Sequence, residues 1–165
     1  MRIADALLQE LEQEAATTRR VLERVPTAHL AWKPHPKSMS LGQLALHVAS
    51  TPGQVAELVR ESPRQLPRFQ APVPTSTDDI LQAFTTSIAD ARRLLSGYDD
   101  GAMMAAWQLE RDGRTLMNLP RVAVLRGIML NHWYHHRGQL SVYLRQLDIP
   151  VPSIYGPSAD ENPFG

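Results

Sequence analysis

Half of the histidines in this sequence lie in one short segment, and histidine is the side chain whose charge changes most readily near neutral pH. The chain has six histidines, and the segment NHWYHHRGQL holds His132, His135 and His136. His132 and His136 are separated by one helical repeat, so on a helix they would lie one above the other on the same face. Two such imidazoles can converge on one metal ion, with Zn–N distances of about 2.0–2.1 Å if the ion is zinc.

A metal site needs more than two protein ligands, and His47 on a different predicted helix is the candidate for the third. Helices that face one another in a bundle contribute side chains to shared interior sites. The alternative is an ordinary core histidine bonded to a backbone carbonyl, which for His47 alone is the simpler interpretation. For His132 and His136 together, that alternative requires two buried rings each to find polar partners, which is costly. The sequence therefore predicts a metal site formed by His47, His132 and His136.

No catalytic residue can be named from the sequence. The zinc peptidase motif HExxH places a glutamate directly after its first histidine, whereas here Trp133 follows His132. No Ser–His–Asp arrangement stands out either. The other histidines are not ligand candidates, because His29 and His35 lie in or beside a proline-broken linker and His135 falls on the flank of its helix.

The neighbours of the paired histidines have simpler expected roles. Trp133 and Tyr134 should point away from the metal face and pack against a neighbouring element or a second subunit. Arg137 is expected to form a salt bridge, and Gln139 falls near His132, where it could support the ligand. Gly138 is unusual inside a helix, where it costs about 1 kcal/mol relative to alanine, and predicts the close approach of another backbone.

Four segments have the apolar periodicity of helices. The second begins with a capping box formed by Ser40 and Gln43, and Pro52 inside it predicts a kink or a split. Ser76 or Thr77 should cap the third. The predicted helices span about residues 2–23, 40–61, 78–95 and 119–147.

The connections between these helices complete the predicted fold. The segment SPRQLPRFQAPVPTS predicts a long, irregular, proline-rich loop, and Asp112-Gly113 allows a small hairpin before the last helix. Four long helices with little strand signal predict an all-α, up-down-up-down four-helix bundle. A length of 165 residues is typical of one domain, so residues 1–165 are expected to form a single unit.

Composition excludes several classes of function. Acidic and basic residues balance at 17 each, and no basic run forms a stripe that would bind nucleic acid. The chain has no cysteine, which excludes disulfides, thiolate ligands and a cysteine nucleophile. No apolar stretch is long enough to span a bilayer and no signal peptide is recognisable, so a cytoplasmic protein without a membrane partner is expected.

Two segments, SMSLGQLALHVAS and NHWYHHRGQLSVYLRQLDIPVPSIYGPS, resemble the DinB-like family, the DinB/YfiT-like metalloenzymes. The similarity extends over nearly the whole chain. It implies a four-helix bundle whose three histidines bind a divalent metal ion, commonly nickel or zinc. Position by position those ligands are His47, His132 and His136, whereas His135 matches a histidine that is usually not a ligand. The resemblance also implies a homodimer.

Relatives in this family include bacillithiol-dependent thiol transferases and a mycothiol-dependent maleylpyruvate isomerase. The resemblance therefore implies a small-molecule substrate and a low-molecular-weight thiol as cosubstrate, in a metal-dependent S-transferase. Two alternatives stay open: a noncatalytic metal-binding or stress-response bundle with a structural ion, and a metal-dependent hydrolase. An open position on the ion beside a cavity favours an enzyme, and a fourth protein ligand without a cavity favours a structural role.

Overall fold

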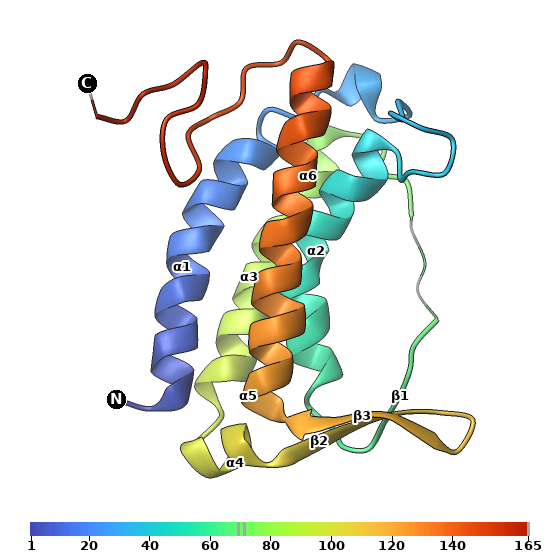
Figure 1. The fold of residues 1–165 in the computed structure, drawn as a ribbon, viewed down its shortest axis with the longest axis vertical. Helices are drawn as coiled ribbons and strands as arrows, with labels where there is room; N and C mark the ends of the chain where they lie inside the picture. Colours follow the sequence, from blue (N-terminus) through green and yellow to red (C-terminus); the bar gives the residue numbers. More distant parts are fainter. Residues whose placement is uncertain (69, 71, 165) are drawn as a thin grey trace.

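The computed structural model describes residues 1–68, 70 and 72–164. Four long helices pack side by side and form the body of the molecule (Figure 1). The last of them continues a short helix, α5, through a π-helical segment, so that together they form one long rod. The bounds of these elements are Ile3–Leu22 for α1, Leu41–Leu58 for α2, Thr77–Ser96 for α3, Arg121–Val124 for α5, Leu125–Asn131 for the π-helical segment and His132–Gln146 for α6.

The helices do not alternate in direction, so the predicted up-down-up-down order is wrong. In Figure 1, α1 and α6 run one way, whereas α2 and α3 both run the other way. The starts of α2 and α3 lie at the same end, since a methyl group built on Gly42 would lie 3.2 Å from Pro74, just before α3, and farther along the pair the Gly53 N–H donates to the Ser87 hydroxyl at 2.8 Å. The reason is the connection over residues 59–76: at about 3.3 Å per extended residue it can run back along α2, where each residue rises only about 1.5 Å.

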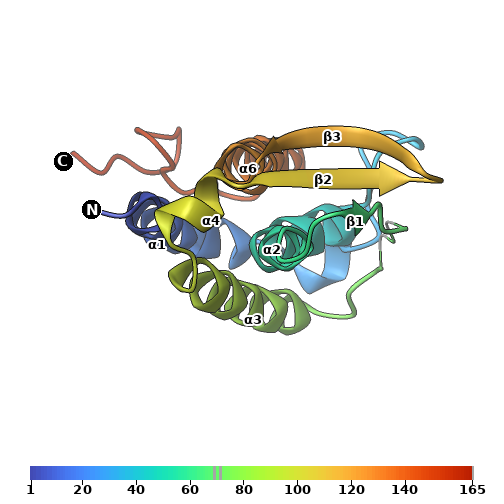
Figure 2. The ribbon, with the colours of Figure 1, turned by 90° about the horizontal axis from the view of Figure 1, so that it is seen from below.

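The all-α prediction is also wrong, because a three-stranded mixed sheet lies at one end of the bundle (Figure 2). Strand β1, Arg64–Gln65, pairs in parallel with β2, Ala106–Arg111, and β2 pairs in antiparallel with β3, Arg114–Pro120. Asp112 and Gly113 join β2 to β3, both with positive φ, as a two-residue hairpin turn requires. A short helix, α4, Asp100–Met104, precedes β2.

Both α2 and α3 begin with a serine N-cap, as predicted. Ser40 accepts a hydrogen bond from the Gln43 backbone N–H at 3.2 Å, and the Gln43 side chain accepts one from the Ser40 N–H at 2.9 Å. Ser76 is the residue that caps α3, where it forms the same reciprocal arrangement with Asp79. Pro52 lies inside α2 without splitting it. The prediction for the proline-rich loop at residues 69 and 71 falls outside the described residues.

The core runs along the middle of the bundle and contains the apolar faces of all four long helices. Trp107 of β2 closes it at the sheet end, where its indole N–H donates to the Glu61 carbonyl at 2.8 Å. Among the described helices, none combines the length and apolar character needed to cross a membrane. The arrangement places α2 against α6, and that interface carries the histidines.

Candidate metal centre

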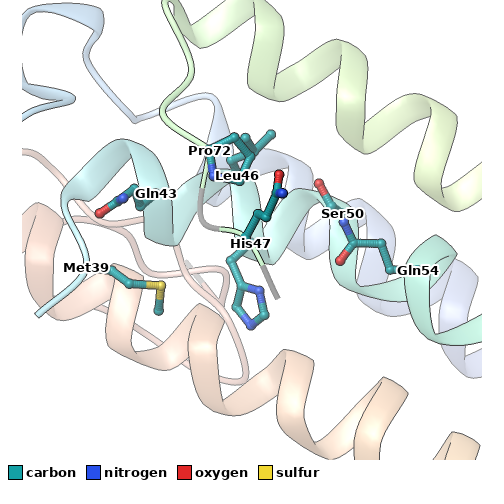
Figure 3. Close-up of a pocket in the computed structure, with 8 residues that line it drawn as sticks. Met39, Gln43, Leu46, His47, Ser50, Gln54 and Pro72 are labelled. Atoms are coloured by element: carbon teal, nitrogen blue, oxygen red, sulfur yellow. The ribbon is translucent and has the colours of Figure 1, made fainter. Parts of the chain in front are cut away.

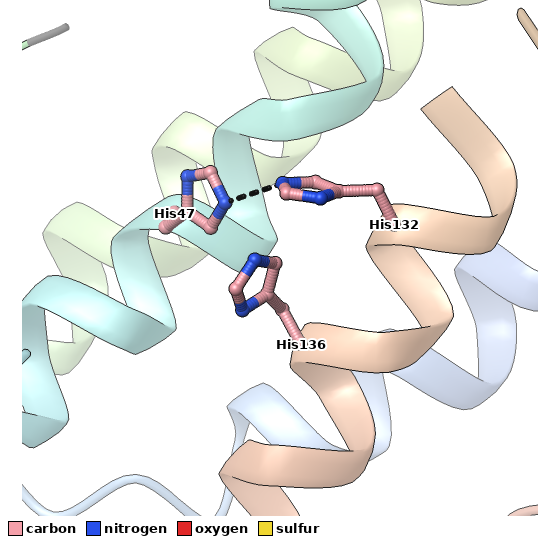
Figure 4. Close-up of side chains that lie close together, drawn as sticks. All are labelled: His47, His132 and His136. Atoms are coloured by element: carbon pink, nitrogen blue, oxygen red, sulfur yellow. Dashed lines mark hydrogen bonds between the residues drawn. The ribbon is translucent and has the colours of Figure 1, made fainter. Parts of the chain in front are cut away.

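The structure brings the three predicted histidines together between α2 and α6 (Figure 4). His47 extends from α2, and His132 and His136 extend from the first two turns of α6. One ring nitrogen from each residue can be chosen so that all three lie within 4.8 Å of one another. The closest pair is His47 Nε2 and His132 Nε2, at 3.1 Å. The ring centroids are 5.3, 4.5 and 4.3 Å apart, so the rings surround a common point.

The surroundings keep these imidazoles neutral. Burial, followed by the nearby His136 and His132, lowers the pKa of His47 from 6.5 to about 4. Burial is also the main reason that the pKa values of His132 and His136 are lowered, although the hydrogen bond to Gln139 opposes the effect at His136. A neutral imidazole is the form that binds a metal ion, because a protonated ring has no free lone pair.

The hydrogen bonds of the rings fit a metal ion at their centre. His136 Nδ1 lies 2.7 Å from Gln139 Oε1, and if this nitrogen donates its proton to the amide oxygen, the Nε2 lone pair is free to bind an ion. His47 and His132 face each other through Nε2 atoms. In tetrahedral zinc geometry two such nitrogens are separated by about 3.3 Å, so the observed 3.1 Å needs little change. The donor set therefore suits a divalent cation.

A small cavity of about 60 Å³ reaches His47 from the outer side of α2 (Figure 3). Since about 10–15 Å³ of volume open to a water-sized sphere is enough for one water molecule, the cavity can accept a small polar group beside His47, which is the one clustered histidine among its described lining residues. None of the described residues that line the cavity carries a formal charge unless His47 is protonated. These residues are Met39, Gln43, Leu46, His47, Ser50, Gln54, Gln70 and Pro72.

The other histidines do not belong to the cluster of three, although the His135 ring lies 5.1 Å from that of His136. His29, His35 and His135 are exposed. Trp133 is buried and packs within the bundle, and Tyr134 donates its hydroxyl to Glu10 at 2.8 Å.

Arg137 forms the expected salt bridge, but in a buried setting. Its guanidinium lies 2.6 Å from the Glu14 carboxylate, with side-chain exposures of 1% and 15%. The same group donates to the Thr18 hydroxyl at 3.0 Å and to the Tyr155 hydroxyl at 2.5 Å. Arg137 therefore ties α6 to α1 and to the C-terminal segment.

Two expectations about this helix were wrong in detail. Gln139 bonds to His136 rather than supporting His132. Within the described part of the chain no other element approaches Gly138, since a methyl group built on it would meet nothing within 4 Å. The cavity was not predicted from the sequence, although its residues Gln43, His47, Ser50 and Gln54 recur at helical spacing on α2. That polar stripe was the available signal, because it runs beside the apolar stripe of the same helix and includes His47, a candidate ligand.

Comparisons with known proteins agree over almost the whole chain. The model of the DinB family matches residues 1–162. An uncharacterised protein of Bacillus subtilis strain 168, YrdA, is 28% identical over 158 residues, which cover 95% of this chain and 90% of YrdA. The crystal structure of a DinB-like protein from Bacillus cereus ATCC 10987 is 25% identical with a TM-score of 0.71, covering 92% of this chain and 97% of the other.

A second solved structure, the DinB-like protein YjoA from Bacillus subtilis, has a TM-score of 0.67 at 20% identity. The match covers 88% of this chain and 95% of the other. At this level of identity the likeness concerns the fold.

Proposed function

The chain belongs to the DinB family, and on that premise we propose that it binds one divalent metal ion, nickel or zinc, through His47, His132 and His136. The observation that supports the proposal is the convergence of three neutral imidazoles from two facing helices. Imidazole nitrogens suit nickel and zinc, whereas magnesium and calcium prefer oxygen ligands.

We further propose that the protein is a metal-dependent transferase that uses a low-molecular-weight thiol. A divalent cation at this site would lower the pKa of a coordinated thiol and so favour the nucleophilic thiolate. In the transfer, the thiol sulfur forms a bond to an electrophilic carbon, the bond from that carbon to its leaving group breaks, and the thiol proton passes to solvent. Because the chain has no cysteine, the thiol must come from a second molecule.

The surroundings of the histidines support an enzyme over a structural site. The described residues supply three imidazoles to the cluster and no fourth ligand, which leaves a cation open to another molecule. The cavity leaves space for a small group against one of the three imidazoles, that of His47. Gln139 holds His136 in one orientation, and the half-buried rings limit access of bulk water.

The first test is the metal content of untagged protein purified without a chelator. The wild type should contain about one equivalent of nickel or zinc, and His136→Ala should lose at least about 100-fold in metal affinity, since even residues that only support a ligand cost 10–100-fold. His135→Ala is the matched control, because it removes an exposed neighbouring imidazole, and it should retain the metal. Unchanged metal content in His136→Ala would show that the site assignment is wrong.

The second test separates catalysis from metal storage. The metal-loaded protein is incubated with a reactive electrophile and bacillithiol, mycothiol, glutathione or cysteine in turn. We expect turnover with one of these thiols that disappears in His136→Ala and persists in His135→Ala. If no thiol gives metal-dependent turnover while the metal is retained, the transferase proposal fails and the metal-binding proposal stands.

A further inference from the structure

Helix α2 contains a break in its hydrogen-bond ladder directly beside His47. In an α-helix the carbonyl of Val48 accepts from the N–H of residue 52, but residue 52 is Pro52, which has no N–H. The carbonyl accepts instead from the indole N–H of Trp133 on α6, at 2.8 Å. Val48 and Trp133 are both fully buried, so this carbonyl has no access to water as a substitute partner.

Backbone groups next to the same break also bind α2 to α3. The Gly53 N–H donates to the Ser87 hydroxyl at 2.8 Å, and that hydroxyl donates to the Ser50 carbonyl at 3.1 Å. A methyl group on Gly53 would lie 2.9 Å from the Ser87 backbone, so the two helices approach closely here. The segment from Ser50 to Gly53 is therefore fixed to α3 on one side, while Val48 is fixed to α6 on the other.

The bond between Val48 and Trp133 lies next to the metal ligands in both helices. Val48 follows His47 in the chain, and Trp133 follows His132. We propose that Pro52 and Trp133 form a positioning device: the proline frees a carbonyl on α2, and the indole that takes it sets the axial register of α2 against α6, so that His47 and His132 meet. This inference rests on the proposed metal site.

A hydrogen bond between two helices fixes their relative position along the axis more precisely than apolar packing does. Apolar side chains tolerate small sliding between helices, whereas a hydrogen bond weakens steeply when its geometry is lost. A metal site requires its ligands to be placed within about 0.5 Å, and successive residues on a helix are separated by about 1.5 Å along the axis. A fixed contact one residue from each ligand therefore limits the sliding that would separate the imidazoles.

The test uses Co²⁺ alone as the probe, because its visible absorption reports both affinity and coordination geometry. Trp133→Phe removes the indole N–H and should weaken Co²⁺ binding about 10-fold, in the range for residues that hold a ligand in place. It should also lower the melting temperature, since the Val48 carbonyl loses its partner in a buried position. Trp107→Phe is the matched control: it too removes a buried indole N–H that donates to a backbone carbonyl, that of Glu61, and it should leave Co²⁺ affinity unchanged.

The double variant Pro52→Ala/Trp133→Phe separates positioning from stability. Alanine restores an N–H at residue 52, which can satisfy the Val48 carbonyl within α2. We expect the melting temperature to recover relative to Trp133→Phe while Co²⁺ affinity and the absorption spectrum stay perturbed. Recovery of affinity together with stability, or unchanged affinity in Trp133→Phe, would overturn the positioning role. Failure of the wild type to bind Co²⁺, or wild-type binding by His136→Ala, would instead contradict the metal site itself.

Discussion

Helix α6 carries two polar clusters on different faces, and the buried polar groups of the two clusters are satisfied in different ways. Toward α1, the Arg137 guanidinium lies against the Glu14 carboxylate and between the rings of Tyr134 and Tyr155, at 5.3 and 5.0 Å. Toward α2, His132 and His136 meet His47. The first cluster contains a cation, its counterion and their hydrogen-bond partners. The second contains three groups of one kind, all able to bind a cation.

The difference indicates which cluster is built for an external partner. Burying Arg137 is tolerable because the protein itself supplies the opposite charge. Among the ion pairs of the described residues, none joins a carboxylate to the clustered histidines, and burial lowers all three pKa values. The histidine cluster is thus a set of lone pairs without a positive charge at its centre. A divalent cation would complete it, as Arg137 and Glu14 complete each other.

The comparison predicts that the Arg137 cluster governs stability without governing metal binding. Arg137→Met should destabilise the protein by about 3–5 kcal/mol, because it leaves the Glu14 carboxylate without its buried partner. Urea unfolding measures this loss, and Co²⁺ titration of the folded variant should give an affinity close to that of the wild type.

Arg92→Met is the control for removing an arginine from an ion pair. Arg92 pairs with Glu12 at the surface, where the two side chains are 53% and 46% exposed, so its loss should cost less than about 1 kcal/mol. If Arg137→Met remained folded but lost Co²⁺ binding, the two faces of α6 would not be separable.

The histidine cluster should make the metal-free protein sensitive to acid. The pKa of His47 is about 4 in the folded protein and about 6.5 in an unfolded chain, so between these values the unfolded state binds more protons. Stability contributed by the neutral ring is complete above pH 6.5 and is lost as pH falls toward 4. Allowing for partial solvent screening, the loss from pH 7 to 4.5 is about 2 kcal/mol.

The measurement is urea unfolding of chelator-treated protein across this pH range, compared with His47→Gln. The glutamine does not titrate, so the difference between the two proteins isolates His47 from the carboxylates, which also lose stability in acid. A difference in stability that stays constant from pH 7 to 4.5 would show that His47 is not held neutral by the fold.

The sequence was sufficient to predict that the three histidines meet, because their placement depends on local periodicity. His132 and His136 share a face of any helix that contains both, and His47 lies beside the apolar stripe of α2, so packing of the apolar faces brings them together. The capping of α2 by Ser40 and Gln43 was also readable, since it involves neighbouring residues.

The hairpin of β2 and β3 was readable from Asp112-Gly113. The direction of α3 and the pairing of β1 with β2 were not readable, because both depend on contacts between distant segments. A short turn after α2 would make α3 antiparallel to α2, whereas a connection that returns to the start of α2 makes the two helices parallel. The periodicity of the helices does not distinguish these two courses. Strand β1 has only Arg64 and Gln65, too few for an alternating pattern, and it is a strand because Leu109 and Glu110 lie beside it. The bond from Trp133 to Val48 was hidden for the same reason, although Pro52 predicted that some carbonyl on α2 would need another donor.

Replacing Gly138 by alanine gives the smallest predicted change in stability. It tests whether α6, which carries both clusters, must bend at this residue. Gly138 follows His136 and Arg137 directly, is exposed, and a methyl group there meets no atom within 4 Å. Gly138→Ala should therefore stabilise the protein by about 0.5–1 kcal/mol through helix propensity. The opposite is expected at Gly53, where a methyl group would lie 2.9 Å from the Ser87 backbone. If Gly138→Ala raises stability in urea unfolding and keeps Co²⁺ affinity, α6 acts as a rigid support for both clusters. If affinity falls while stability rises, the histidine face requires local bending that the Arg137 face does not.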